Sequence, residues 1–130
     1  MPDRRGGGVL TQHVLLIEDE ANIAEAISFL LSREGLRVSH APEGVSALEL
    51  LRKDPPDLVI LDHMLPGMSG LEILSLLRAE PKTRDLPVMM LTARGRDRAM
   101  AEEAGADRFM TKPFSNVEIL SEVRAMLGRS

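Results

Sequence analysis

The chain is 130 residues long, and its content of 44% hydrophobic and 28% charged residues is typical of one globular domain and excludes a disordered or fibrous protein. Its net charge of −4 offers no strong positive field to nucleic-acid phosphates, so we expect no direct nucleic-acid binding by this chain. With no cysteine and no apolar run long enough to cross a bilayer, the sequence predicts a cytoplasmic protein without a membrane partner.

The N-terminal segment over residues 1–12 shows no hydrophobic periodicity. It contains Pro2 and the Gly6-Gly7-Gly8 run, residues that favour irregular backbone. We therefore predict a flexible N-terminal arm over residues 1–12 and one folded domain over residues 13–128.

Short apolar runs alternate with longer amphipathic stretches along the rest of the chain, which is typical of βαβ units. The apolar runs predict β-strands at 13–17, 37–41, 58–61, 87–91 and 108–111. Most of these runs lack polar alternation, as expected for parallel strands that helices cover on both faces. The run at 37–41 does alternate with polar residues, so we predict it near an edge of the sheet.

The amphipathic stretches predict five helices, each of which follows one strand. They comprise 21–34, a helix with Val45, Leu48 and Leu51 on one face, a helix with Leu71, Leu74 and Leu77, a short helix at 96–104, and a last helix with Val117, Leu120, Val123 and Leu127. Ser69 with Glu72, and Ser115 with Glu118, predict capping boxes at the start of the third and fifth helices. This strict alternation indicates a doubly wound α/β fold.

Charged and hydroxyl side chains stand directly after four of the predicted strands. Glu18 and Asp19 follow the first strand, Asp62 the third, Thr92 the fourth and Lys112 the fifth. Because the carboxyl ends of parallel strands share one edge of the sheet, where α/β proteins bind ligands, we expect these side chains to converge. Each acidic residue alone could equally be a helix N-cap, but together the four strand ends favour a shared site.

Carboxylates held close together repel one another unless one is protonated or a cation binds between them. A cation is the better explanation here, and oxygen ligands without His or Cys favour Mg²⁺. Asp62 could then attack phosphorus as a nucleophile and form an acyl phosphate, while Mg²⁺ and Lys112 counter the charge on the transferring group.

The same residues lie in stretches that resemble the receiver domains of bacterial response regulators, and in detail the PhoB/OmpR-type receivers. The similarity runs from about His13 to Leu127, and its most specific stretches are 14–20, 56–62, 64–67, 91–94 and 105–114. It implies a flavodoxin-like, doubly wound (βα)5 sandwich of the α/β class, with a five-stranded parallel sheet in the strand order 2-1-3-4-5.

This resemblance implies a role for each residue of the predicted metal site. Asp62 would be the phosphoacceptor and a metal ligand. Asp19 would bind Mg²⁺ directly, and Glu18 would be the second acidic residue of the site, although many members have Asp at that position. Met64 would contribute only its backbone carbonyl to the metal.

Three more residues would act on the phosphoryl group or respond to it. By the resemblance, Thr92 would donate its hydroxyl to a phosphoryl oxygen and Lys112 would pair with another. Phe109 matches the switch aromatic, which rotates inward as Thr92 moves. The Lys112–Pro113 peptide bond would be cis. His63, next to Asp62, would either tune access or dephosphorylation or, more simply, be a partly exposed loop residue without a task.

We therefore predict a phosphoacceptor receiver of two-component signalling, in which a sensor histidine kinase or phosphotransfer protein supplies the phosphoryl group to Asp62. Phosphorylation would switch a partner surface, and a possible homodimer surface, built from the fourth helix, fifth strand and fifth helix. Such a domain catalyses only its own phosphorylation and slow dephosphorylation, and is not an enzyme in the ordinary sense. The alternatives are a pseudo-receiver that binds or dimerises without phosphotransfer, and a phosphohydrolase, which would usually need a second acid two residues after Asp62.

Overall fold

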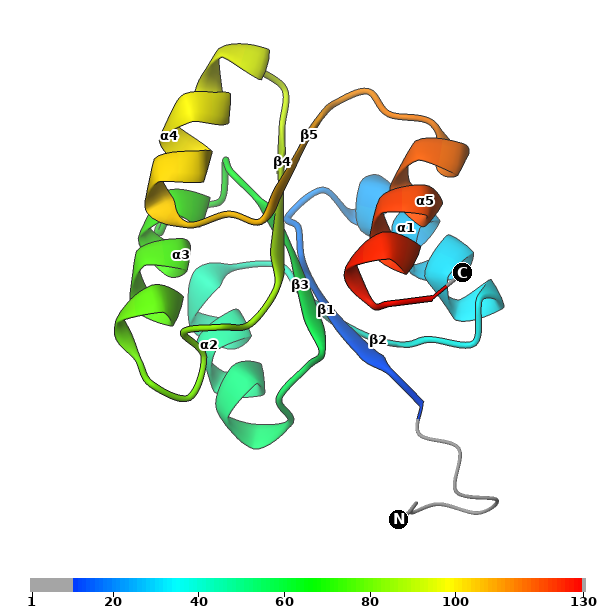
Figure 1. The fold of residues 1–130 in the computed structure, drawn as a ribbon, viewed down its shortest axis with the longest axis horizontal. Coiled ribbons are helices and arrows are strands. Elements are labelled where there is room, and N and C mark those ends of the chain that lie inside the picture. The colour runs from blue at the N-terminus through cyan, green and yellow to red at the C-terminus, as the bar shows by residue number, and fades with distance from the viewer. Residues whose placement is uncertain (1–10, 130) are drawn as a thin grey trace.

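The five apolar runs form the strands of one parallel sheet in the computed structural model, which describes residues 11–129 (Figure 1). The strands are β1 (His13–Ile17), β2 (Arg37–Ala41), β3 (Leu58–Asp62), β4 (Val88–Thr92) and β5 (Arg108–Thr111). Their order is β2-β1-β3-β4-β5, which confirms the predicted flavodoxin-like fold. The strand β2 lies at an edge of the sheet, in agreement with its alternating sequence.

Helices cover both faces of this sheet. They are α1 (Ala21–Arg33), α2 (Gly44–Lys53), α3 (Gly70–Ala79), α4 (Arg98–Ala104) and α5 (Asn116–Met126), and the 3-10 turn η2 (Gly95–Asp97) directly precedes α4. In Figure 1, α1 and α5 lie on one side of the sheet, and α2, α3 and α4 lie on the other. None of the helices within residues 11–129 is long and apolar enough to cross a membrane.

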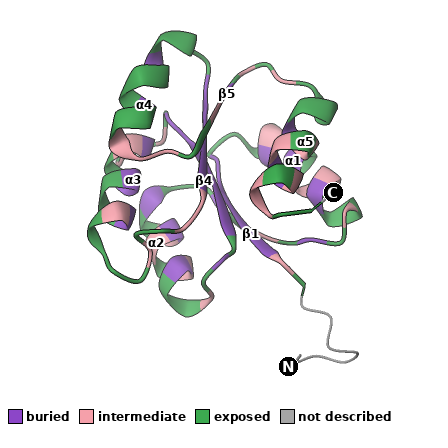
Figure 2. Cartoon of the chain, viewed as in Figure 1, coloured by how far each residue is buried: buried purple, intermediate pink, exposed green. Residues whose placement is uncertain are grey.

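The sheet divides the core into two layers, and neighbouring residues of β1 face opposite layers. Val14 and Leu16 pack in the layer that contains the buried residues of α1 and α5. Leu15 and Ile17 pack in the layer of α2, α3 and α4. Every residue of β1, β3 and β4 is buried, as Figure 2 shows for β1 and β4. Because each fully buried Leu or Ile side chain stabilises the fold by roughly 1.5–3 kcal/mol, these strands anchor the edge where the polar residues lie.

Two helix faces differ from the sequence prediction. The periodicity places Val45 of α2 and Val117 of α5 on apolar faces, but their side chains are 63% and 77% exposed. The buried residues of α5 are Ile119 and Val123, and Val117 precedes Ile119 by two positions, about 200° around the helix. Val45 precedes the buried Ala47 by the same two positions. Both predictions are wrong because apolar spacing within one helix does not fix which face meets the sheet.

The helix starts at α3 and α5 agree with the predicted capping boxes. In α3, the Glu72 N–H donates to Ser69 Oγ over 3.2 Å, and the Ser69 N–H donates to Glu72 Oε1 over 2.9 Å. The Ser115 and Glu118 pair makes the same two bonds, at 3.0 and 2.8 Å. Each cap contributes about 1 kcal/mol to stability. The Lys112–Pro113 peptide bond, which precedes α5, is cis as the resemblance implies.

The predicted N-terminal arm lies mainly outside the described residues, which begin at Thr11. Its last residue, Gln12, is bonded to the domain. The Gln12 amide nitrogen donates to the Leu127 carbonyl over 3.1 Å, and the Gln12 carbonyl accepts from the Arg37 N–H over 2.9 Å. The chain is therefore tied to the domain one residue before β1 begins.

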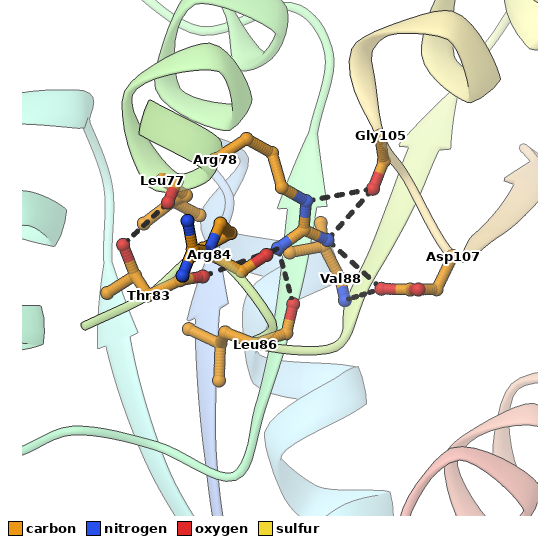
Figure 3. Close-up of polar contacts among 8 residues, drawn as sticks. All are labelled: Leu77, Arg78, Thr83, Arg84, Leu86, Val88, Gly105 and Asp107. Atoms are coloured by element: carbon orange, nitrogen blue, oxygen red, sulfur yellow. Dashed lines mark hydrogen bonds and ion pairs between the residues drawn. The ribbon is translucent and has the colours of Figure 1, made fainter. Parts of the chain in front are cut away.

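Arg78 of α3 joins three segments at the end of the sheet where β4 begins (Figure 3). Its Nε and Nη2 donate to the Gly105 carbonyl over 3.0 and 2.8 Å, and its Nη1 donates to the Leu86 carbonyl over 2.8 Å. Its Nη2 also lies 3.1 Å from Asp107 Oδ2, which accepts from the Val88 N–H over 2.9 Å. One guanidinium thus satisfies carbonyls that would otherwise lack partners after α3 and α4.

Candidate functional site

The carboxyl edge of the sheet carries side chains from four strand ends. Asp62 is the last residue of β3, the middle strand, and Thr92 is the last residue of the adjacent β4. Glu18 and Asp19 follow β1 on the other side of β3, and Lys112 follows β5. Asp62 therefore lies between the acidic residues and the hydroxyl.

Glu18, Asp19 and Asp62 form a compact group, which we call the acidic cluster. One carboxylate oxygen from each residue lies within 4.8 Å of the other two. Glu18 and Asp62 are buried, and Asp19 is exposed. Three oxygen donors with one exposed side are a suitable set for a hard divalent cation, and Mg²⁺ commonly keeps water on such an open side.

The ammonium group of Lys112 lies directly beside the acidic cluster. Its Nζ donates to Glu18 Oε1 over 3.1 Å and lies 3.3 Å from Asp62 Oδ1. Glu20 Oε1 is a third neighbour at 3.6 Å. One positive charge therefore faces three carboxylates, so the site retains an excess of negative charge.

The protonation of the acidic cluster reflects this excess of charge and the burial of the site. Burial raises the pKa of Glu18 to about 7, and the nearby negative charge of Asp62 adds to the effect. Burial also raises the pKa of Asp62. Burial opposes the charged form of Lys112, but the hydrogen bond to Glu18 and the charge of Asp62 prevail and raise its pKa. The pair of buried acids therefore favours either a proton or a further cation.

Thr92 bonds to Asp97, a residue that the sequence patterns did not indicate as part of the site. The Thr92 hydroxyl donates to Asp97 Oδ2 over 3.0 Å, and both side chains are buried. The Arg94 N–H donates to Thr92 Oγ1 over 3.2 Å. The only sequence signal for Asp97 was its place in the predicted helix at 96–104, where an acidic residue in the first turn suggests ordinary capping. Its side chain makes no cap hydrogen bond.

His63 differs from the simpler of its two sequence interpretations. Its side chain is buried rather than partly exposed, with 7% of its surface accessible. Its Nδ1 lies 3.2 Å from Asp97 Oδ2, but the two atoms are not aligned for a hydrogen bond. The loop after β3 folds back under α3, because the Gly70 N–H donates to the His63 carbonyl over 2.9 Å. The buried His63 ring thus lies beside Asp97, the residue that accepts the Thr92 hydroxyl proton.

Gly70 is another contributor that the sequence did not reveal. It is the first residue of α3, and a Cβ atom there would collide with the Asp62 carbonyl oxygen and lie 2.9 Å from His63 Cα. Both neighbours are backbone, so the helix could not keep its place with a larger residue. The missing side chain lets α3 pack directly against the loop that carries Asp62.

The two remaining predicted site residues, Met64 and Phe109, lie in the loop after β3 and in β5. Met64 is in the loop after β3, and its side chain is 63% exposed, so that only its backbone is suited to a buried role. Phe109 of β5 is partly buried, and the Arg98 guanidinium carbon lies 4.9 Å from the centre of its ring. Phe109 thus contacts the start of α4 through a cation–π interaction.

Sequence comparison identifies the family that this chain resembles. The sequence profile of the family described as the response regulator receiver domain matches residues 14–124. The phosphate regulon transcriptional regulatory protein PhoB of Klebsiella pneumoniae is 44% identical over 122 residues, which are 92% of this chain and 53% of that protein. The probable transcriptional regulatory protein TcrX of Mycobacterium tuberculosis is 44% identical over 119 residues, which are 90% of this chain and 50% of that protein. The chain thus spans about half the length of these curated relatives.

Comparison with solved structures gives the same result. The signal receiver domain of a signal transduction histidine kinase from Syntrophus aciditrophicus is 33% identical, with a TM-score of 0.84 and 91% of each chain covered. The receiver domain of a sensor histidine kinase from Pseudomonas aeruginosa is 27% identical, with a TM-score of 0.83 over 92% of this chain and 99% of that chain. That second structure holds a magnesium ion coordinated in its active site cleft.

The relatives correct the partners predicted from the sequence. That prediction excluded nucleic acid because the net charge is −4, but PhoB and TcrX are transcriptional regulatory proteins. The physical reason for the error is that the charge belongs to a chain that covers only about half of each relative. The charge of this chain does not report on the partners of relatives about twice its length, so the exclusion of nucleic acid from the predicted partners is wrong.

Proposed function

We propose, on the premise that this chain belongs to the family of response regulator receiver domains, that Asp62 accepts a phosphoryl group in a Mg²⁺-dependent step. The observation that supports this proposal best is the acidic cluster, whose three oxygens lie within 4.8 Å of one another with the Lys112 ammonium 3.3 Å from Asp62. A nucleophilic carboxylate, a set of metal ligands and a fixed positive charge are the components that phosphoryl transfer requires.

The acidic cluster would hold the metal ion. Asp19 and Asp62 would bind it directly, Glu18 would be the second acidic residue, and the Met64 carbonyl would complete the protein ligands. The donors are all oxygen, and burial, with a smaller contribution from the charge of Asp62, raises the pKa of Glu18, so a bound cation would favour its ionised form. When bound, Mg²⁺ supplies charge neutralisation for the carboxylates and the transferring group.

Asp62 performs the covalent step. One of its carboxylate oxygens attacks phosphorus opposite the leaving group, so that an O–P bond forms while the bond between phosphorus and the donor breaks. With a phosphohistidine donor, the leaving imidazole nitrogen keeps the electron pair of the broken bond. Lys112 remains beside Asp62 and balances charge on the phosphoryl oxygens.

The acyl phosphate would then change the surface around α4, β5 and α5. It adds about −1.5 to −2 charges and three acceptor oxygens, to which Thr92, at the end of β4, and Lys112, after β5, would donate. Movement of Thr92 would be followed by Phe109, and this would bias an existing equilibrium between two conformations. The domain is modified once per signal and does not turn over a separate substrate.

A histidine kinase is the proposed phosphodonor, and the cytoplasm is the proposed location. Control of transcription is the proposed output, which is supported by the names of the relatives PhoB and TcrX. A pseudo-receiver that works without phosphotransfer is not favoured, since the acceptor, the acidic residues and Lys112 are all present.

The test is the mass of the intact protein after incubation with acetyl phosphate. We expect one added phosphoryl group when Mg²⁺ is present, and none when Mg²⁺ is chelated, because the cluster then keeps its excess negative charge. Asp62→Asn should stay unmodified under both conditions, whereas Asp85→Asn, at an exposed carboxylate in the segment before β4, should behave as the parent protein does. Equal labelling of the parent protein and Asp62→Asn would refute the assignment of the acceptor.

A further inference from the structure

Asp97 is a buried carboxylate that has no part in the proposed phosphoryl transfer. It lies at the junction of η2 and α4, and only 4% of its surface is accessible. Its Oδ2 accepts the hydroxyl proton of Thr92 over 3.0 Å. Because burial of an unpaired carboxylate is costly, its neighbours must compensate for the lost hydration.

Three groups converge on the same Asp97 oxygen. Besides the Thr92 hydroxyl, Arg94 Nε lies 3.3 Å from Oδ2 and His63 Nδ1 lies 3.2 Å from it. Burial alone would raise the pKa of Asp97, but the Thr92 hydrogen bond and the charge of Arg94 lower it. Asp97 is therefore a carboxylate at neutral pH and a strong acceptor for the Thr92 proton.

A threonine hydroxyl has one proton to donate. While that proton is shared with Asp97, it is not available to a phosphoryl oxygen on Asp62. The bond is buried and one partner is charged, and such a bond is stronger than a hydroxyl bond to water. The acyl phosphate and Asp97 must therefore compete for the same donor.

We propose that Asp97 is a positioning residue that holds the Thr92 hydroxyl in the unphosphorylated protein and must release it when Asp62 is phosphorylated. This inference rests on the proposed function, because it assumes that Thr92 donates to the phosphoryl group. It gives the Thr92 proton two alternative acceptors, Asp97 before phosphorylation and the phosphoryl group after it. The Asp97 bond therefore stabilises the unphosphorylated conformation.

Release of Thr92 would also reach the start of α4. Asp97 directly precedes Arg98, the first residue of α4. The residue that accepts the Thr92 proton is therefore also the residue at which α4 begins. Arg98 in turn stacks on Phe109. Loss of the Thr92 bond would therefore free the same helix end that contacts the predicted switch aromatic.

A double-mutant cycle between Asp97 and Thr92 tests this proposal. The readout is the affinity of the Mg²⁺-loaded protein for beryllofluoride, which mimics the phosphoryl group on a carboxylate and can be followed by ¹⁹F NMR. We expect Asp97→Ala to bind about tenfold more tightly than the parent protein, the loss of one charged hydrogen bond, with Asp97→Asn between the two. In a Thr92→Ala background, the same Asp97 substitutions should leave the affinity unchanged.

The outcomes separate the possible failures. An equal gain in beryllofluoride affinity with Thr92 and with Thr92→Ala would show a simple charge effect of Asp97 and overturn the proposal. A folded Asp97→Asn variant that binds beryllofluoride no more tightly than the parent protein would overturn it as well. Asp97→Asn keeps the side-chain shape and carries the test alone if circular dichroism shows that Asp97→Ala is unfolded. If the parent protein binds beryllofluoride no better than Asp62→Asn does, the proposed phosphoacceptor itself is wrong.

Discussion

At the scale of single residues, Glu18 is an ionisable side chain that is completely buried, so that its charged form is disfavoured. Its side chain has no accessible surface, and it shares Lys112 with Asp62. Burial raises its pKa in the folded protein from 4.5 to about 7. Between these two values, the folded protein holds a proton that the unfolded chain has released.

This proton makes the stability of the metal-free protein depend on pH. Because the folded state binds more protons than the unfolded state in this window, the free energy of unfolding should fall as pH rises from about 5 to 7, by at most ~1.4 kcal/mol per pH unit. The measurement is urea denaturation in chelator across this range. Glu18→Gln, which cannot ionise, should give a flatter profile than the parent protein, and parallel profiles would contradict the assignment of the raised pKa to Glu18.

At the scale of elements, α3, α4 and the segment before β4 are joined by side chain to backbone bonds from Arg78. The Gly105 carbonyl receives two of these bonds, just after α4 ends. Gly105 has a φ of 105°, a left-handed conformation that glycine adopts without strain. The end of α4 thus depends on a glycine for its backbone and on Arg78 for its hydrogen bonding.

Arg78→Ala should destabilise the protein by roughly 2 kcal/mol or more, because the Gly105 and Leu86 carbonyls would lose a charged donor. Arg78→Lys should recover only part of this loss, since an ammonium cannot reproduce the planar set of donors. Thermal unfolding measures both effects. Arg84→Ala is the matched control, because Arg84 contributes its carbonyl and not its side chain to the network, and it should be close to neutral.

At the scale of the whole molecule, metal binding should raise the stability of the entire domain. The acidic cluster draws its ligands from the ends of β1 and β3, so the site exists only in the folded chain. A ligand that binds the folded state alone, at a hundred times its Kd, adds about 2.7 kcal/mol.

We therefore expect Mg²⁺ to increase the Tm in a concentration-dependent way. Asp19→Asn should lose most of this increase, because it removes a proposed ligand at the exposed side of the acidic cluster. Glu103→Gln, a substitution at an exposed acid of α4, should retain it and controls for the change in net charge. A Mg²⁺ effect of equal size in both variants would indicate general ionic stabilisation instead of a site.

The sequence predicted the strands and the edge residues well because both follow from local order along the chain. An apolar run of five residues specifies a buried parallel strand, and whatever follows it must lie at the carboxyl edge. The bonds from Arg78 to Gly105 and from Thr92 to Asp97 depend on packing between separate elements and on side-chain rotamers, which no spacing rule contains. The exposed faces of Val45 and Val117 were missed for the same reason, since only the neighbouring sheet decides which side of a helix is covered.

The anchoring of Gly105 by Arg78 has a mechanical consequence for α4. The helix is fastened at its C-terminal end by two bonds to a guanidinium, whereas its N-terminal end is attached to the sheet through the Asp97 bond to Thr92. When the Thr92 bond is lost, α4 should therefore rotate about its C-terminal end and should not translate along its axis. The largest displacement on α4 should therefore occur near Arg98, and the smallest near Ala104.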